Sequence, residues 1–578
     1  MSPSLSSRTQ RPLSGAALPK SPQLLSSRTS LIVALSGLAI LFAVYRSSLD
    51  FQFILDDHRF IGDPRIQFSG HLWDYFSNFV WAQFTGGPPS FYRPLFLVWL
   101  RANFLIAGLS TWGWHLLSIA KHAMAAALLG LLVWELLADR MAALAAAVLF
   151  ALHPAQVESV AWVTVPDPLL AICVFCALFF WLKYEESFPS EPLPGKRSRP
   201  SAKPGDQPSA RWLAASVIAA FAAMLAKETA IVLPAILLAL SLWAPPQNSP
   251  AATRNPTRED SRLRSFFRAL RLTAPFFAVT VLYLLLRLHA LAGKLGSRTQ
   301  DLPWSTVVLS WPATLWFYLK VLFWPAHSYA FADPTLVANF SARGVLLPAF
   351  AVLGLIALFG GTIHWAWRKS VRSLPRQDAA KIKSALLLGS LLLVLPLLLT
   401  LDLNALNPGD FLHGRYTYLP LAGLLLLAAT AWHLAGRMRI PLLCAAAALA
   451  AGFAALTVSQ EKQWADDLTV FTVAHQLAPN NAPVAQNLAN AHVQQALQWA
   501  DDGRCGEALP VFRQVTEQYR EDWFAWAGLG DCLAQLDQLP QAEQALHRAA
   551  DLAHDPRITE QWQQLRIQMG LAASPPQH

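Results

Sequence analysis

Apolar residues occur in long, nearly uninterrupted runs over most of the chain. A membrane core takes a helix of about 20 apolar residues to cross, and several runs are shorter, so they would have to be tilted or covered by neighbours. The runs able to span, or nearly so, are 31–46, 113–137, 142–156, 167–184, 211–226, 229–243, 272–290, 344–366, 384–400, 418–435 and 440–458. The pattern predicts an all-α, polytopic helical bundle with a transmembrane domain over residues 31–458.

Two further apolar stretches, 93–110 and 305–325, are ambiguous. Each contains a basic residue or a proline within the run, together with aromatic residues. Such a mixture is typical of helices that lie along a membrane surface. We therefore predict that both stretches lie at the outer interface and do not span.

The basic loops give the orientation. They are the N-terminal tail, 196–211, 254–271, 368–383 and 437–439. Lys and Arg concentrate in cytoplasmic loops, and all five loops share one side only if the two ambiguous stretches do not span. This predicts eleven spans with the N-terminus in the cytoplasm and the C-terminus outside. Residues 1–30 lack the apolar segment of a cleavable signal and are predicted to be a disordered cytoplasmic tail.

Composition supports a membrane protein. Charged residues make up 14% of the chain, against about 25% in soluble globular proteins. The net charge of +9 sits in short loops between spans, which favours a role in orientation and argues against nucleic-acid binding. Of the five cysteines, Cys173 and Cys176 lie in an apolar helix without a histidine or carboxylate nearby, so zinc is not expected. Cys505 and Cys532 could pair in an oxidising compartment or stay free.

After Ser459 the sequence becomes polar and helical, with a repeat. Ala508, Phe512 and Val515 recur as Ala542, Leu546 and Ala549, 34 residues later. This period, with small and large residues at fixed positions, is typical of tetratricopeptide repeats, although a generic helical hairpin is the alternative. We assign the repeats to residues 459–556 and a final helix and tail to 557–578, and their concave face could bind protein partners.

The predicted topology leaves most ionisable residues at membrane level on the outer face, and polar groups at that depth usually mark a site. They are Asp56, Asp57, Arg93, His153, Glu158, Asp167, Lys227, Glu228, Asp402, Asp410, His413 and Arg415. For the adjacent Asp56 and Asp57, the alternative to a catalytic role is a solvated turn. His115 and His122 share one helical face, where they could join an acid in binding a metal, but polar packing is the commoner role.

Several short motifs follow one another in a characteristic order. They are Asp56-Asp57, Tyr92-Arg93-Pro94-Leu95, His115 and His122, His153-Pro154 through Glu158 to Trp162, Asp167, Ala226-Lys227-Glu228-Thr229, Tyr318-Leu319-Lys320 with Pro325, and Arg415-Tyr416-Thr417-Tyr418-Leu419-Pro420. With the repeats behind them, these motifs resemble the transmembrane and tetratricopeptide-repeat-containing O-mannosyltransferases and their bacterial relatives, within the C-type glycosyltransferase superfamily. The resemblance covers roughly residues 50–555, and the Ala/Leu-rich composition and few repeats favour a bacterial relative.

The resemblance implies an enzyme that uses a sugar, such as mannose, linked to a polyprenyl phosphate. The acceptor would be a hydroxyl of a periplasmic or lumenal protein or of an envelope glycan, and the setting a bacterial inner membrane with periplasmic repeats. Asp56 or Asp57 would act as the base. Arg93, Arg415 and then Lys227 would hold the leaving phosphate. Glu228 would be a further substrate-binding residue. Glu158 and Asp167 would bind sugar hydroxyls or orient a cation, and some members of the superfamily use a divalent metal, which the sequence does not decide.

Structural roles remain as alternatives for the same residues. Arg93 and Arg415 could anchor the chain at lipid headgroups, Lys227 and Glu228 could form an ion pair with each other, and Glu158 and Asp167 could serve in structural pairs. The sequence also departs from the family, because Val165 and Pro166 stand before Asp167 where a basic segment is usual. That departure leaves the donor or its binding mode open.

Three other functions fit less well. A lipid-linked oligosaccharide ligase would place its key residues in one large outer loop, whereas the segment 401–417 is short. A tetratricopeptide scaffold with a membrane anchor would need one or two spans rather than eleven. A transporter would show matching halves with broken helices at mid-membrane, which the sequence lacks.

Overall fold

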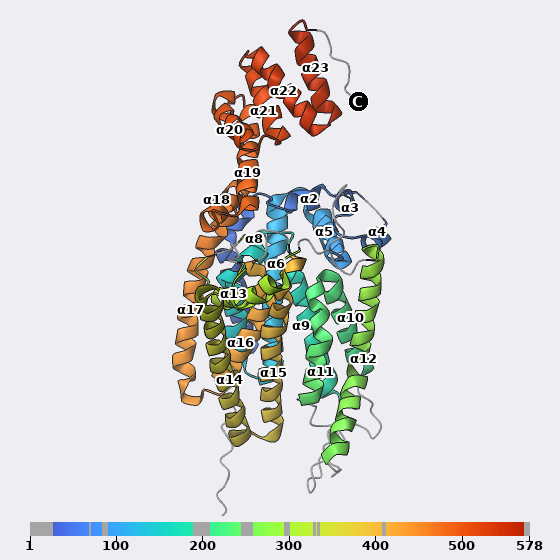
Figure 1. Cartoon of the computed structure of the whole chain (residues 1–578). Coiled ribbons are helices and arrows are strands. Elements are labelled where there is room, and N and C mark those ends of the chain that lie inside the picture. The colour runs from blue at the N-terminus through green and yellow to red at the C-terminus, as the bar shows by residue number, and fades with distance from the viewer. Residues whose placement is uncertain are drawn as a thin grey trace, which may run out of the picture.

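The computed structural model describes the chain in nine stretches. They are residues 27–68, 71–83, 91–188, 209–243, 258–293, 301–327, 331, 336–406 and 412–571. Within them the regular elements are all helices (Figure 1), so the predicted all-α class is confirmed. The predicted tail over 1–30 lies outside the described residues up to residue 26, as do Asp410, most of the basic loop 196–211 and the final residues 572–578.

Each of the eleven predicted spans contains a helix. They are α1 (Ser27–Val44), α6 (Thr111–Leu137), α7 (Arg140–Leu152), α9 (Asp167–Glu186), α10 (Ala210–Ala226), α11 (Leu233–Trp243), α12 (Arg258–Ala290), α14 (Leu347–Ser373), α15 (Arg376–Leu398), α16 (Tyr418–His433) and α17 (Arg439–Glu461). Among the described residues, seven helices are long and apolar enough to cross a membrane, or eight if one bent pair counts as a single span. The count of eleven therefore includes helices too short to qualify by length alone.

The predicted span 142–156 is not one straight helix. The helix α7 ends at Leu152, and the segment Pro154–Ala161, which contains α8 (Val157–Ala161), continues at an angle of 55° to it. Pro154 explains the break, because proline has no N–H and disfavours helical backbone at the residue before it. His153 accordingly has extended backbone, with φ −69° and ψ 125°.

The stretch 305–325 forms α13 (Trp304–Phe323), which meets the length and composition criteria for a span. Its neighbours nevertheless lie at one end of the bundle. It packs against α14 and against the short turns at 342–346, 399–401 and 414–417, and Figure 1 shows it in the half of the bundle nearer the C-terminal helices. These contacts agree with a position along the outer surface, which stays a prediction.

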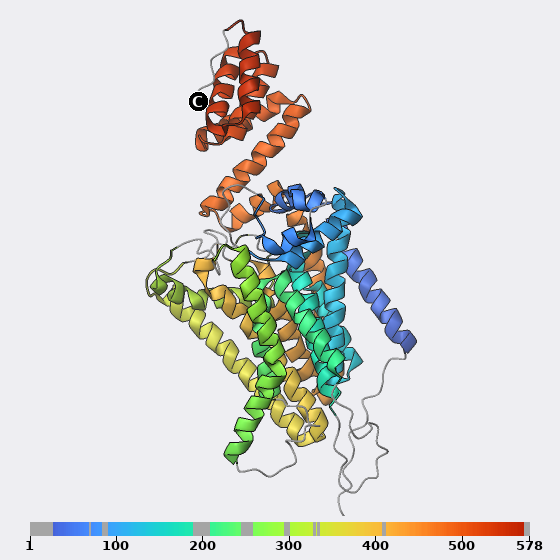
Figure 2. The ribbon, with the colours of Figure 1, turned by 90° about the vertical axis from the view of Figure 1, so that its right-hand side faces the viewer.

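Small helices surround the same end of the bundle, which we call the repeat-side end. They are α2 (Asp57–Gly62), α3 (Pro64–Gln67), α4 (Leu72–Ser77) and α5 (Pro94–Ala107). The last of these, α5, is the other stretch predicted to lie at the interface. Figures 1 and 2 show the C-terminal helices projecting beyond this end.

The C-terminal domain is a stack of helices. They are α18 (Asp467–Leu477), α19 (Ala482–Asp501), α20 (Cys505–Gln518), α21 (Trp523–Gln535), α22 (Leu539–Ala553) and α23 (Pro556–Gln568), each packed on the next. Gly530 explains the close approach of α21 and α22, since a Cβ there would lie 2.6 Å from the Leu546 side chain. The helix α17 runs past Ser459 to Glu461, so the change in composition comes slightly before the change of domain.

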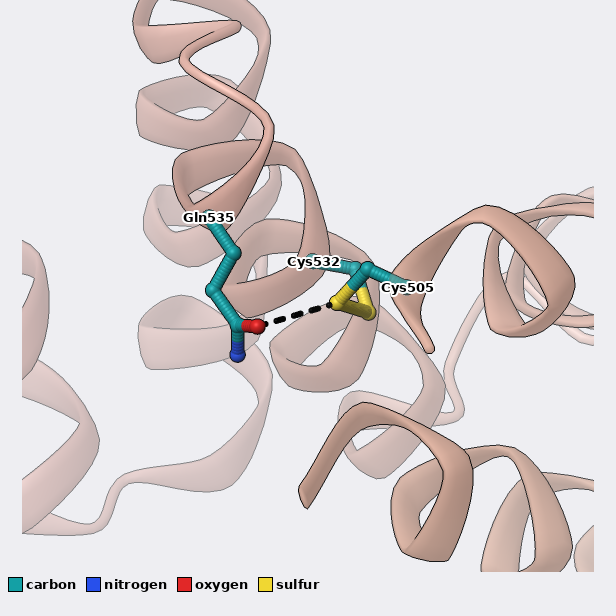
Figure 3. Close-up of a disulfide and its surroundings, with 3 residues drawn as sticks. All are labelled: Cys505, Cys532 and Gln535. Carbon is teal, nitrogen blue, oxygen red and sulfur yellow. Dashed lines mark hydrogen bonds between the residues drawn. A yellow bond between two sulfur atoms is a disulfide. The ribbon is translucent and has the colours of Figure 1, made fainter. Parts of the chain in front are cut away.

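A disulfide joins two of these helices. Cys505, at the start of α20, is bonded to Cys532 in α21, with their Cα atoms 5.0 Å apart (Figure 3). Gln535 lies beside the bond, with its side-chain oxygen 3.4 Å from Cys505 Sγ. The structure thus forms the pairing that the sequence left open. Disulfides persist in oxidising compartments and are rare in the cytosol.

The helices α15 and α16 meet through two glycines, and this contact gives a stability prediction. A Cβ on Gly423 would lie 2.5 Å from the backbone oxygen of Gly389, so Gly423→Ala has to push the two helices apart. We expect it to lower the free energy of unfolding by about 1–3 kcal/mol, the usual cost of overpacking, in thermal unfolding of the detergent-solubilised protein. Gly452→Ala is the control, because a Cβ there meets nothing within 4 Å. Equal unfolding temperatures for the two variants would contradict the prediction.

Candidate functional site

Asp56 and Asp57 lie in a turn at the repeat-side end, which we call the acidic turn. Asp57 begins α2 and is fully buried. Its Oδ1 accepts hydrogen bonds from the Thr164 backbone N–H at 3.1 Å and hydroxyl at 2.6 Å, and its Oδ2 accepts one from Ile54 N at 3.2 Å. Asp56, by contrast, is only partly buried. The two adjacent carboxylates therefore differ in environment, and the turn is not simply a solvated one.

Burial gives the Asp57 carboxyl an unusual acidity. Loss of hydration disfavours the charged form and raises the pKa of Asp57 to about 7, even though the hydrogen bonds from Thr164 and Ile54 lower it. A group with a pKa near neutrality can both take and release a proton. This is the property required of a general base.

A second carboxylate, Glu158, lies on the bent segment after α7. Its Oε2 accepts from Arg415 N at 2.9 Å, and its Oε1 lies 3.1 Å from Arg415 Nη1 and 2.9 Å from His413 Nδ1. Gly414, between His413 and Arg415, lies close to the same carboxylate, and a Cβ there would lie 3.3 Å from Glu158 Oε2. The Arg415 guanidinium also lies over the Trp162 ring, 4.6 Å from its centroid. The pairing with Glu158 and the stacking on Trp162 place Arg415 within the site.

Lys227 and Glu228 do not pair with each other. Lys227 Nζ lies 2.7 and 2.8 Å from the two Asp167 oxygens, and both of these side chains are buried. Glu228 instead accepts two hydrogen bonds from Arg93, at 2.9 Å from Nε and 2.5 Å from Nη2. The reason is the backbone of Lys227, which is extended at φ −159° and ψ 139°. Neighbouring side chains on extended backbone point to opposite faces.

These ion pairs form one group, which we call the charge cluster. It consists of Arg93, Glu158, Asp167, Lys227, Glu228 and Arg415. Lys227 interacts electrostatically with both arginines, and its ammonium lies 5.0 Å from the centroid of the Tyr416 ring. The structure therefore brings together all six residues that the sequence singled out for substrate binding.

Lys121 links the cluster to the acidic turn, and the sequence analysis missed it. It lies in α6, is 2% exposed, and donates to Val165 O at 3.2 Å. Its ammonium interacts electrostatically with both Asp167 and Asp57. A lysine in the middle of an apolar run was the available signal, since charge at membrane depth is costly without a role. Thr164, which holds Asp57, gave no comparable signal.

The histidines have separate roles. His122 Nδ1 lies 2.6 Å from Tyr418 Oη and its Nε2 lies 3.1 Å from Ala151 O, which is polar packing. His115 lies edge-on to Phe51, and His153 Nε2 contacts Leu322 O at 3.1 Å. Within the described residues no three His, Cys, Asp or Glu side chains gather as metal ligands do. The carboxylates of the charge cluster are bound by cationic side chains.

Two family models match parts of the chain. Residues 49–250 match a model described as dolichyl-phosphate-mannose-protein mannosyltransferase, and residues 500–566 match a tetratricopeptide-repeat model. The first range contains every residue of the acidic turn and the charge cluster except Arg415. The second confirms the helical repeats predicted from the 34-residue period.

Curated relatives show the same resemblance. The chain is 37% identical over 199 residues to the protein O-mannosyl-transferase Tmtc2 of Drosophila melanogaster, a match covering 33% of this chain and 20% of the relative. Tmtc1 of the same organism is 32% identical over 198 residues, a match covering 33% of this chain and 21% of the relative. TMTC3 of Mus musculus is 33% identical over 152 residues, a match covering 26% of this chain and 16% of the relative. The matches thus span about a fifth of the relatives' length or less, and the resemblance predicted from the motifs is confirmed over that part.

Solved structures give weaker likenesses. The apo oligosaccharyltransferase of Archaeoglobus fulgidus has 14% identity and a TM-score of 0.39, with 80% of this chain and 60% of that chain covered. ArnT from Cupriavidus metallidurans bound to undecaprenyl phosphate has 15% identity and a TM-score of 0.34, with 91% and 78% covered. At these TM-scores the two likenesses do not support a conclusion about this chain.

Proposed function

We propose that the protein is a membrane glycosyltransferase that moves a sugar from a polyprenyl phosphate to an acceptor hydroxyl. One observation carries this proposal: a buried carboxylate with a pKa near neutrality and a cluster of cationic side chains meet at one end of an apolar helical bundle. The matches to mannosyltransferases favour mannose as the sugar and a protein hydroxyl as the acceptor. An envelope glycan is the other acceptor that the same chemistry serves.

We assign the site to the outer face of a bacterial inner membrane. The basic segments at the starts of α12 and α17 and the repeats belong to opposite ends of the bundle (Figure 1). The disulfide between Cys505 and Cys532 supports an oxidising compartment for the repeats. A lipid-linked donor would then lie with its tail among the helices and its sugar at the site.

The acidic pair supplies the base. The acceptor hydroxyl attacks the anomeric carbon as its proton passes to a carboxylate, and the bond from that carbon to the phosphate oxygen breaks with its electrons on the phosphate. Asp57 fits this role better than Asp56 because its pKa lies near neutrality. The Thr164 hydroxyl donates to Asp57 Oδ1, so an acceptor hydroxyl has to displace it to reach the carboxylate.

The arginines stabilise the leaving phosphate. Arg93 and Arg415 side chains are each 15% exposed, whereas Lys227 is 5% exposed, so the two guanidinium groups are the ones that reach a ligand. Their planar forks suit phosphate oxygens. Lys227 is buried and adds positive potential. Glu158 holds Arg415, Asp167 holds Lys227, and Glu228 holds Arg93 in place.

A reconstituted transfer assay tests the function. The purified protein in liposomes is supplied with polyprenyl-phosphate-linked radiolabelled mannose and with envelope and periplasmic proteins from cells that lack it. Label is expected in an alkali-labile glycan on a protein or in an envelope glycan, with release of polyprenyl phosphate. Folded protein that transfers no mannose, and no other sugar from the same lipid, contradicts the proposal.

The rate of transfer should depend on pH through Asp57. Because the base is active when deprotonated, and burial raises the pKa of Asp57 to about 7, the rate should rise as pH increases from 5 to 8, with a midpoint at about 7. The measurement is kcat against pH at saturating donor and acceptor. A midpoint near 4, the usual value for an aspartate, would show that the base is not in this buried environment.

A further inference from the structure

The first helix of the repeat domain contacts the acidic turn directly. Asp467, at the start of α18, accepts a hydrogen bond from Leu55 N through Oδ1 at 2.8 Å. Its other oxygen lies 3.0 Å from His58 Nε2. One side chain of the repeat domain therefore binds two residues that flank Asp56 and Asp57, across more than 400 positions of sequence.

The turn that Asp467 binds has an unfavourable backbone. Asp57 N donates to Ile54 O at 2.9 Å, and Ile54 N donates back to Asp57 Oδ2 at 3.2 Å. Between them Leu55 has φ +54°, a region that residues with a branched side chain seldom adopt. Such conformations persist where surrounding contacts hold them, and they concentrate at functional sites. The bond to Asp467 is one of the contacts that hold Leu55.

Apolar packing fixes α18 against the same segment. Gln52 N donates to Ala465 O at 2.9 Å, and Trp464 stacks on Trp162, with ring centroids 6.4 Å apart. Trp162 is also the ring under Arg415. A buried apolar cluster joins the segments 51–54, 157–165 and 464–470. It consists of Phe51, Ile54, Val157, Ala161, Trp162, Val165, Trp464 and Val470. The first residues of the repeat domain thus pack against the segment that contains the acidic turn.

We propose that Asp467 is a positioning residue that holds the Asp57 turn in its reactive conformation, so that the repeat domain sets the rate of the chemical step. This inference rests on the proposed function, because it assigns Asp57 the role of base. A displacement of a reacting group by about 1 Å can cost up to about 100-fold in rate. Removing the acceptor for Leu55 N–H should therefore lower kcat, while the affinity for donor lipid and for a short acceptor peptide stays unchanged.

Three variants of the full-length protein test this. Asp467→Ala removes both contacts and should lower kcat by about 10- to 100-fold. Asp467→Asn keeps an oxygen that can accept from Leu55 N–H and should retain most of kcat. Asp466→Ala is the matched control, because Asp466 caps the same helix by accepting from Thr469 N at 2.8 Å, which is a contact within α18. It should leave kcat near the wild-type value.

Amide hydrogen exchange gives a readout that does not depend on activity. Exchange in residues 53–58 should become faster in Asp467→Ala and stay unchanged in Asp466→Ala. If Asp467→Ala does not insert, Asp467→Ser takes its place, since a serine hydroxyl is too short to reach Leu55 N–H. Equal kcat and equal exchange for the Asp467 and Asp466 variants overturn the inference, because α18 then only docks on the membrane domain.

The failure of this inference is distinct from failure of the proposed function. If Asp57→Asn abolishes transfer while Asp467→Ala keeps wild-type kcat, only the positioning role is wrong. If Asp57→Asn itself keeps wild-type transfer, the assignment of the base is wrong, and the positioning role falls with it.

Discussion

Asp57→Asn is expected to lower the rate of sugar transfer by about 100- to 10,000-fold, the usual contribution of a general base. Asparagine has nearly the same shape and keeps one oxygen that can accept from Thr164, but its amide nitrogen replaces the oxygen that accepts from Ile54 N, and it cannot take a proton. The measurement is kcat with polyprenyl-phosphate-linked mannose at pH 8. Asp50→Asn is the matched control, because Asp50 is exposed and pairs with the exposed Arg46.

The pH dependence of stability in the same variant separates chemistry from folding. Burial raises the pKa of Asp57 to about 7, above the value of about 4 expected in the unfolded chain. Folded protein therefore binds this proton more tightly, so stability from this group is fully present below about pH 4 and is lost as pH rises towards 7. Asp57→Asn should remove that loss, so its unfolding temperature relative to the wild type should rise between pH 5 and pH 8. A variant that is inactive and destabilised by the same amount across this pH range would instead indicate a structural role.

The second large effect concerns the buried pair of Lys227 and Asp167. Lys227→Met leaves the Asp167 carboxylate buried without its partner, which should cost about 3–5 kcal/mol of stability. Adding Asp167→Leu replaces the pair with apolar side chains and should recover most of that loss. Activity should not recover, because the positive potential beside Arg93 and Arg415 is missing when the phosphate departs. We expect kcat of the double variant to remain about 100-fold below that of the wild type. This is comparable to the loss of a hydrogen-bond donor that stabilises developing negative charge.

The comparison needs thermal unfolding and kcat measured on the same samples. Lys183→Met is the matched control, because Lys183 lies at the other end of α9, pairs with Glu135 at 2.6 Å, and is 29% exposed. A partly exposed pair contributes about 1 kcal/mol or less, and this one is remote from the site. Recovery of both stability and activity in the double variant would show that the Lys227–Asp167 pair is structural only.

Local patterns in the sequence were sufficient for the helices and for the membership of the charge cluster. Apolar runs give the spans because each residue's preference for lipid or water acts independently of its distant neighbours. The repeat follows from a period within the chain itself. The residues of the charge cluster were among twelve that stood out because each is ionisable at a depth where ionisable groups are costly, and the family resemblance then selected them.

The partners of those residues were not predictable from the sequence. Lys227 could have paired with Glu228 beside it, but the extended backbone at Lys227 turns the two side chains apart, towards Asp167 and Arg93. Lys121 was overlooked because its apolar run indicates only a span. Its relation to Asp57 and Asp167 depends on how α6 packs against α8 and α9.

The sequence by itself therefore determined the helical class and the repeats, since these follow from composition and spacing along one chain, and its motifs supplied the set of charged residues through the family resemblance. Only the tertiary structure decided the bend after Leu152, the burial that sets the pKa of Asp57, and the contact of Asp467 with Leu55. The physical reason is that hydration and ion pairing depend on every segment that surrounds a group. Those segments come together only when the helices pack.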